Sequence, residues 1–355
     1  MAVYLLIAIG TVLFGAWYDL SRSKSGRVLA FAFLFLTLFI PAAIRFELGG
    51  DCVNVYAPAC DDIIDGKDVN FEPFFTWSVL FLDGVVENIP QTIFAFFSFL
   101  TLLFAIVSLR RPCFTVAATA YVLLYYPFGL SGIRQALALS FMLFAVRMYE
   151  TRRYVWSVIM VALAFSSHYT ILMMPVLYFA SVGLARLSKK VIHVALMASV
   201  VVAGLLNPMA ILSGLIGNTR YGYYLSSDKY MDGAQLGSGL GVIAMLVIAA
   251  ILYFLLMSEF KDDEEEPKRL AVLCAVSVIL RVSGLQCEAL RRMSIIGDAF
   301  LPFAMSYICQ KRPDMKNFAI VFVLMTGLFL LFVKDVSNPN PGSLELYPYK
   351  TIFGG

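Results

Sequence analysis

The 355-residue chain is 60% hydrophobic and only 14% charged, whereas an ordinary soluble domain carries about 25% charged residues. The mean hydropathy of +0.82 excludes a soluble globular protein and predicts an all-α polytopic integral membrane protein. The net charge of +3 is small and scattered, so we expect no nucleic-acid partner, which would need a basic stripe.

Apolar runs of the kind that form membrane helices recur along nearly the whole chain. We predict about twelve membrane segments in a single integral membrane domain, residues 1–355. Two of these segments form a broken helix pair that turns near His168. The segments are 2–18, 28–44, 88–108, 113–130, 132–148, 154–167, 169–183, 190–206, 240–258, 270–287, 293–309 and 317–334.

Lysine and arginine cluster between these runs and fix one orientation by the positive-inside rule. Both chain ends and the long loops 45–87 and 207–239 then lie outside, with a polar tail at 335–355. Long loops on one face usually carry binding, and 72–87 is predicted to be a helix on the outer surface. The clusters assigned to the inside are Arg22/Lys24/Arg27, Arg110/Arg111, Arg147/Arg152/Arg153, Arg186/Lys189/Lys190, Lys261/Lys268/Arg269 and Lys311/Arg312/Lys316.

The cysteines and histidines give little support to metal or cofactor chemistry. The cysteines show no CxxC spacing, and the two histidines are far apart, so neither a zinc site nor a cofactor is expected. Cys52 and Cys60 share the loop 45–87 and are either a disulfide or two free thiols.

Arg134 and Gln135 place a permanent charge and an amide at the start of the apolar run 132–148. A charge in a membrane segment costs several kcal/mol and usually has a function, although Arg134 is also placed where an arginine anchors a helix at the interface. His168 interrupts a second run. It is a candidate proton-transfer group or a histidine satisfied in the core.

The predicted orientation brings many polar residues to the outer leaflet. Arginine suits bidentate contact with phosphate oxygens, so several arginines at one face predict a pyrophosphate site. The residues at this face are Arg45, Asp51, Arg134, Gln135, His168, Arg220, Arg281, Arg291 and Arg292.

Several of these residues also have a simpler interpretation. Arg45 is also a candidate topological anchor, and Asp51 a turn or helix-cap residue after two glycines that allow close approach of a ligand. Arg281 must face the protein interior and pair with Glu288 or a ligand. Tyr221 and Tyr224 beside Arg220 suit either stacking on sugar rings or an aromatic belt.

The order of these motifs resembles the EpsG family of bacterial exopolysaccharide proteins, which is grouped with the Wzy-type O-antigen and capsule polymerases. The resemblance spans roughly residues 1–310, and Arg291 or Arg292 matches the late arginine of the family. The motifs are Arg45-x3-Gly49-Gly50-Asp51-x4-Tyr56, Glu72-Pro73-Phe74-Phe75, Ile133-Arg134-Gln135-Ala136-Leu137-Ala138 followed by Tyr149, Ala164-Phe165-x2-His168, and Arg220-Tyr221-x2-Tyr224.

The resemblance implies a GT-C-like polymerase on the outer face of the bacterial inner membrane. It would transfer a growing glycan from undecaprenyl pyrophosphate to the next lipid-linked repeat unit, with a flippase and a chain-length regulator as usual partners. Arg134, helped by Arg45, Arg220 and Arg292, would bind the pyrophosphate. His168 or Asp51 would be the base, and we favour His168 because an aspartate beside an arginine is a weak base.

Two other functions remain open. A transporter or flippase of lipid-linked oligosaccharide would use the same arginines but would need a hydrated path to the inner face. An O-antigen ligase-like transferase would share the chemistry and differ in its acceptor.

Overall fold

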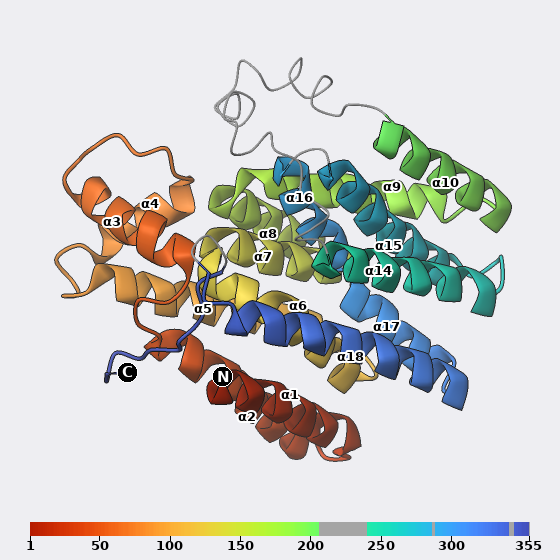
Figure 1. Ribbon diagram of the computed structural model, residues 1–355, viewed down its shortest axis with the longest axis horizontal. Helices are drawn as coiled ribbons and strands as arrows, with labels where there is room; N and C mark the ends of the chain where they lie inside the picture. The colour runs from red at the N-terminus through yellow and green to blue at the C-terminus, as the bar shows by residue number, and fades with distance from the viewer. Residues whose placement is uncertain (206–239, 286–287, 341–343, 355) are drawn as a thin grey trace. The chain divides into compact units, whose positions relative to one another are not determined.

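The computed structural model describes residues 1–205, 240–285, 288–340 and 344–354 (Figure 1). Within these ranges the regular structure is helical, apart from one isolated β-bridge between Arg45 and Thr351. This agrees with the predicted all-α architecture. The chain forms two compact units: a terminal unit of Met1–Leu172 with Val321–Gly355, and a middle unit of Met173–Ile320.

The terminal unit is built around α7, which is buried along most of its length and packs against α5 and α8. The first two helices of this unit, α1 and α2, lie side by side (Figure 1). The elements are α1 (Ala2–Leu20), α2 (Lys24–Ile44), the π-helix η1 (Cys52–Tyr56), α3 (Ala57–Ile64), α4 (Pro73–Leu82), α5 (Ile89–Ser108), α6 (Phe114–Ser131), α7 (Ile133–Glu150), α8 (Tyr154–Ser167), the 3-10 helix η2 (Tyr169–Leu172) and most of α18 (Met315–Ser337).

The middle unit is arranged around α15, which contacts α9, α10, α14, α16 and α17. Its elements are α9 (Met173–Leu184), α10 (Lys189–Leu205), α14 (Leu240–Glu259), α15 (Glu265–Gly284), α16 (Glu288–Asp298) and α17 (Leu301–Lys311). The predicted segment 293–309 is divided between two helices, because α16 ends at Asp298 and α17 begins at Leu301. Pro302 in the first turn of α17 favours a new helix start, since proline disrupts a continuing helix.

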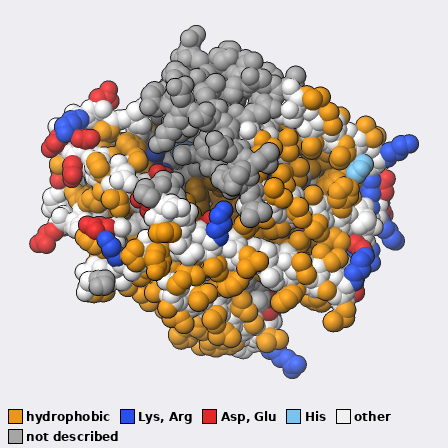
Figure 2. Space-filling view, viewed as in Figure 1, with side chains coloured by type: hydrophobic (Ala, Val, Ile, Leu, Met, Phe, Trp, Pro, Cys, Tyr) orange, Lys and Arg blue, Asp and Glu red, His pale blue; other side chains and the backbone are white. Residues whose placement is uncertain are grey.

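Six of the described helices are long and apolar enough to cross a membrane: α1, α2, α5, α6, α14 and α18. The protein is therefore a multi-pass membrane protein. Hydrophobic side chains cover most of the described surface that Figure 2 shows, and most charged side chains gather toward its margins. The other predicted segments correspond to shorter or more polar helices, such as α7 and α8, so twelve crossings remain a prediction.

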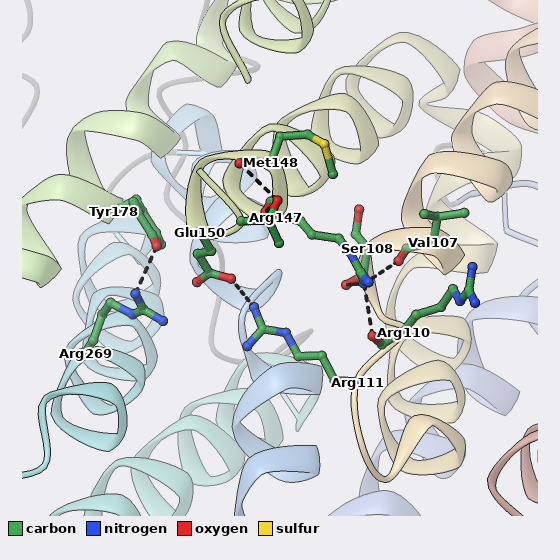
Figure 3. A network of polar contacts seen from close by, with 10 residues as sticks. Val107, Ser108, Arg110, Arg111, Arg147, Met148, Glu150, Tyr178 and Arg269 are labelled. Atoms are coloured by element: carbon green, nitrogen blue, oxygen red, sulfur yellow. Dashed lines mark hydrogen bonds and ion pairs between the residues drawn. The ribbon is translucent and has the colours of Figure 1, made fainter. Parts of the chain in front are cut away.

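Arg147 ties the last turn of α7 to the end of α5. Its guanidinium donates to the carbonyl oxygens of Val107 at 2.6 Å, Ser108 at 3.1 Å and Arg110 at 3.1 Å (Figure 3). These carbonyls lie at the C-terminus of α5, where backbone oxygens lack partners within the helix and attract a cation.

Two more polar contacts lie at this same end of the terminal unit. Arg111 forms an ion pair with Glu150, and Asp19 at the end of α1 accepts the backbone N–H of Thr115 at 2.8 Å. The ends of α1, α5 and α7 therefore meet here. This is the arrangement that a common inner side for these basic clusters requires.

The two chain ends meet within the terminal unit. The Tyr4 hydroxyl donates to the carbonyl of Leu346 at 2.9 Å, and the Tyr4 and Tyr349 rings are 5.7 Å apart. Part of the predicted polar tail is thus held against the fold, with Leu346 fully buried. That both ends lie outside stays a prediction.

Candidate active site

The Gly49-Gly50 pair brings the chain against the end of α6. Gly49 has φ +94°, and a Cβ there would lie 2.4 Å from the carbonyl oxygen of Leu130, so glycine is required. Its backbone N–H donates to the carbonyl of Glu345 at 3.0 Å. The close approach predicted at these glycines is therefore an approach to the protein's own backbone.

The π-helix η1 is fixed to the turn between α6 and α7. The backbone N–H of Asp51 donates to Oγ of Ser131 at 3.2 Å, and the Cys52 thiol donates to the carbonyl of Leu130 at 3.2 Å. Cys52 and Cys60 are buried free thiols, which decides between the two states predicted for this pair. Arg134, in the first turn of α7, follows Ser131 by three residues. These bonds therefore hold η1 beside the start of α7.

Arg134 lies in the first turn of α7 and faces the interior of the terminal unit. Its guanidinium carbon is 4.3 Å from the ring centre of Phe71, 5.1 Å from that of Tyr56 and 5.9 Å from that of Phe75. One nitrogen, Nη1, binds a carboxylate oxygen of Glu72. With 15% of its side chain exposed, Arg134 does not reach out to solvent as a simple interfacial anchor would.

Glu72 holds the centre of the site. It directly precedes Pro73 at the start of α4, and its side chain is only 3% exposed. One oxygen binds Arg134, and the other, Oε1, lies 3.1 Å from Nδ1 of His168. Glu72 therefore joins Arg134 of α7 to His168 at the end of α8.

The electrostatic setting keeps Glu72 ionised. Burial by itself raises the pKa of this carboxyl, but the hydrogen bond from His168 and the charge of Arg134 outweigh it and lower the pKa to about 2. The carboxylate is thus an anion at neutral pH, as a buried cation requires of its partner.

His168 sits where α8 breaks, as predicted. α8 ends at Ser167, His168 is extended with φ −164°, and η2 follows at Tyr169. The hydroxyls of Ser166 and Ser167 both donate to the carbonyl of Leu163, a local bond that competes with helix continuation. The His168 ring is 21% exposed, and its Nε2 has no hydrogen-bond partner among the described residues.

Arg45 has a different environment from Arg134. Its side chain is fully buried, it donates to the carbonyl of Ala42 and to Oγ of Ser98 at 2.9 Å, and it lies over the Phe94 ring. Ala42 is in the last turn of α2, whose carbonyls need outside donors. The structure therefore gives Arg45 the position of a helix cap, and not that of a group facing a ligand.

Asp51 and Gln135 flank this site. Asp51 precedes η1 and is half-buried, and it donates a hydrogen bond to Ser131 through its backbone N–H. Gln135 follows Arg134 in the first turn of α7 and is half-buried too. Neither side chain has a hydrogen-bond partner in the described part of the chain.

The remaining predicted site residues lie in the middle unit or outside the described residues. Arg281 forms an ion pair with Asp298, which also accepts a hydrogen bond from Ser277, whereas the side chain of the expected partner Glu288 lies outside the described part. Arg291 and Arg292 belong to α16, but their side chains are outside the described part. Arg220, Tyr221 and Tyr224 lie in 206–239, which the structure does not describe.

Glu72 stands in the motif Glu72-Pro73-Phe74-Phe75 but was not among the predicted site residues. The signal that predicts it is the rule that a charge buried in a membrane protein needs a partner, applied to Arg134. Among the described residues no group of three His, Cys, Asp or Glu side chains is arranged to hold a metal ion.

Long apolar helices and a buried Arg–Glu–His cluster together define a multi-pass membrane protein with a polar site at one end of its helices. The model of the EpsG family matches residues 28–351. The chain therefore belongs to the EpsG family, which links it to polysaccharide biosynthesis. Neither the curated proteins nor the solved structures contain a significant match to it.

Proposed function

We propose that this protein is a membrane glycosyltransferase that polymerises a polysaccharide on the outer face of the bacterial inner membrane. Its donor is a growing glycan on undecaprenyl pyrophosphate, and its acceptor is the next lipid-linked repeat unit. One observation carries the proposal: Arg134 and His168, from two different helices, share the buried carboxylate of Glu72. A phosphate-binding group and a proton acceptor are thereby side by side.

The transfer step uses the two groups differently. The bond between the anomeric carbon and the pyrophosphate oxygen breaks, and its electron pair leaves with the pyrophosphate. Arg134 stabilises the charge that develops there. The start of α7 adds to this effect, because a helix N-terminus favours an anion.

His168 receives the proton of the acceptor. The acceptor oxygen forms the new bond to the anomeric carbon while its proton passes to Nε2 of His168, the nitrogen not facing Glu72. Glu72 orients the ring through Nδ1, as a carboxylate does in other histidine bases. Asp51 is the alternative base, but no hydrogen bond from the described residues orients its carboxylate.

The test is polymerisation by the purified protein in vesicles with a synthetic lipid-linked repeat unit. We expect a ladder of glycan lengths without added nucleotide. Movement of the lipid-linked unit across the vesicle membrane without a ladder would contradict the proposal and support a transporter. Transfer of a finished glycan to a lipid A acceptor, with no ladder, would support a ligase.

A further inference from the structure

Glu72 connects the two groups of the site through a single carboxylate. Its Oε2 binds Nη1 of Arg134, and its Oε1 lies 3.1 Å from Nδ1 of His168. Only 3% of the side chain is exposed, so bulk water screens this charge poorly. A change in charge at either partner is therefore felt at the other.

The Arg134 guanidinium is held in place, but its hydrogen-bonding capacity is not fully used. Aromatic rings of Tyr56, Phe71 and Phe75 surround it, and its buried Nε has no hydrogen-bond partner among the described residues. Glu72 occupies Nη1. A phosphate group that approaches the same guanidinium meets an anion already bound there, and two anions on one cation repel each other.

We infer that Glu72 is a positioning residue that competes with the lipid pyrophosphate for Arg134 and, once displaced, serves His168 alone. The inference rests on the proposed function. With the pyrophosphate on Arg134, the carboxylate keeps its bond to Nδ1, which leaves Nε2 to accept the acceptor's proton. The same carboxylate then faces the imidazolium that forms and stabilises it. Binding of the lipid-linked donor to Arg134 thus prepares His168 to act as the base.

The experiment compares affinity with rate. The affinity of purified protein in nanodiscs for undecaprenyl pyrophosphate, the leaving group, is measured beside the polymerisation kcat. Glu72→Gln is expected to bind the lipid at least about fivefold more tightly, the lower end of ordinary coupling between two ligands, and to lose kcat. A merely structural residue would weaken both together.

Two further variants keep the test decisive. Glu72→Asp retains the charge on a shorter side chain, so it should bind the lipid more tightly than wild type and keep part of kcat, even where the glutamine variant does not fold. Glu150→Gln removes a carboxylate from the Arg111 ion pair at the other end of α7 (Figure 3). It should leave the affinity unchanged.

Equal or weaker binding by folded Glu72 variants would overturn the inference. A wild type that binds the lipid but forms no polymer would remove the proposed function, while the comparison of affinities would still decide whether Glu72 competes for Arg134.

Discussion

Glu72 remains charged in a buried position because Arg134 and His168 face it on two sides. The pKa of this carboxyl in the folded protein, about 2, is below its ordinary value of 4.5. A group whose pKa is lowered on folding stabilises the protein above its ordinary pKa, and this contribution is lost as the pH falls toward the folded value.

The first prediction follows from the lowered pKa of Glu72 in the folded protein. The difference in melting temperature between wild type and Glu72→Gln in nanodiscs should be constant from pH 7 to about 5 and shrink as the pH falls from 4.5 toward 2. Thermal unfolding followed by circular dichroism measures it. A difference that stays constant over the acid range would show that folding does not lower the pKa of Glu72.

Arg45 and Arg134 have the same side chain but opposite surroundings. Arg45 caps the end of α2 and contacts no carboxylate among the described residues, whereas Arg134 pairs with Glu72. We therefore propose Arg134, and not Arg45, as the pyrophosphate ligand and assign Arg45 to the stability of the fold.

The second prediction separates these roles. Arg45→Met should lower stability by about 1–3 kcal/mol, since it leaves a buried carbonyl without its donor, and should leave the affinity for undecaprenyl pyrophosphate unchanged. Arg134→Lys should weaken that affinity about tenfold, because lysine lacks the planar fork. Isothermal titration with both variants checks this, and a loss of affinity in Arg45→Met would return Arg45 to the site.

Among the elements, the loop 45–51 positions η1 and depends on the C-terminal segment. The backbone N–H of Phe46 donates to the carbonyl of Lys350, that of Gly50 donates to Leu344, and that of Ile352 donates to Ile44. The Tyr349 hydroxyl adds a bond to Pro41 at 2.7 Å. Residues at the far end of the sequence thus support the loop that carries Asp51.

The third prediction tests this loop with neighbouring glycines. Gly49→Ala should destabilise the protein by about 2 kcal/mol or more, because it combines a left-handed φ with a clash against the Leu130 carbonyl. Gly50→Ala is the matched control, since the three atoms nearest to its added Cβ all belong to the side-chain carboxylate of Glu345, at 3.1–3.4 Å. Equal melting temperatures for the two variants would contradict the strained geometry.

The helix breaks and the site residues differ in how far the sequence alone predicts them. The break at His168 could be predicted because hydroxyl and imidazole groups interrupt an apolar run. The break between α16 and α17 is marked in the sequence by Gly297, Asp298 and Pro302, although the apolar character of 293–309 as a whole favours one segment. Glu72 resembles any loop carboxylate in the sequence, and the carbonyls that Arg45 caps are defined only by the fold.

For the whole molecule, the site and the basic end lie at opposite ends of α7. Arg134 and Arg147 stand at its first and last turns, about 20 Å apart at ~1.5 Å per residue. That span is most of the way across a hydrocarbon core of ~30 Å. The arrangement fits a site near one membrane face and basic residues near the other.

The fourth prediction concerns orientation. In intact cells, a membrane-impermeant thiol reagent should label Asp65→Cys, which is exposed directly after α3, before α4. Arg152→Cys, exposed after α7, should be labelled only after the membrane is permeabilised. The reverse pattern would place the site on the inner face.

The most direct measurement of the central claim is single-turnover release of undecaprenyl pyrophosphate from a lipid-linked donor in the presence of acceptor. Wild type should release it, and His168→Ala should slow release about 10²- to 10⁴-fold, the usual contribution of a general base. His193→Ala, which alters the histidine hydrogen-bonded to Tyr253, should keep the wild-type rate. Unchanged release in His168→Ala, or an equal loss in both variants, would contradict a catalytic site centred on Glu72.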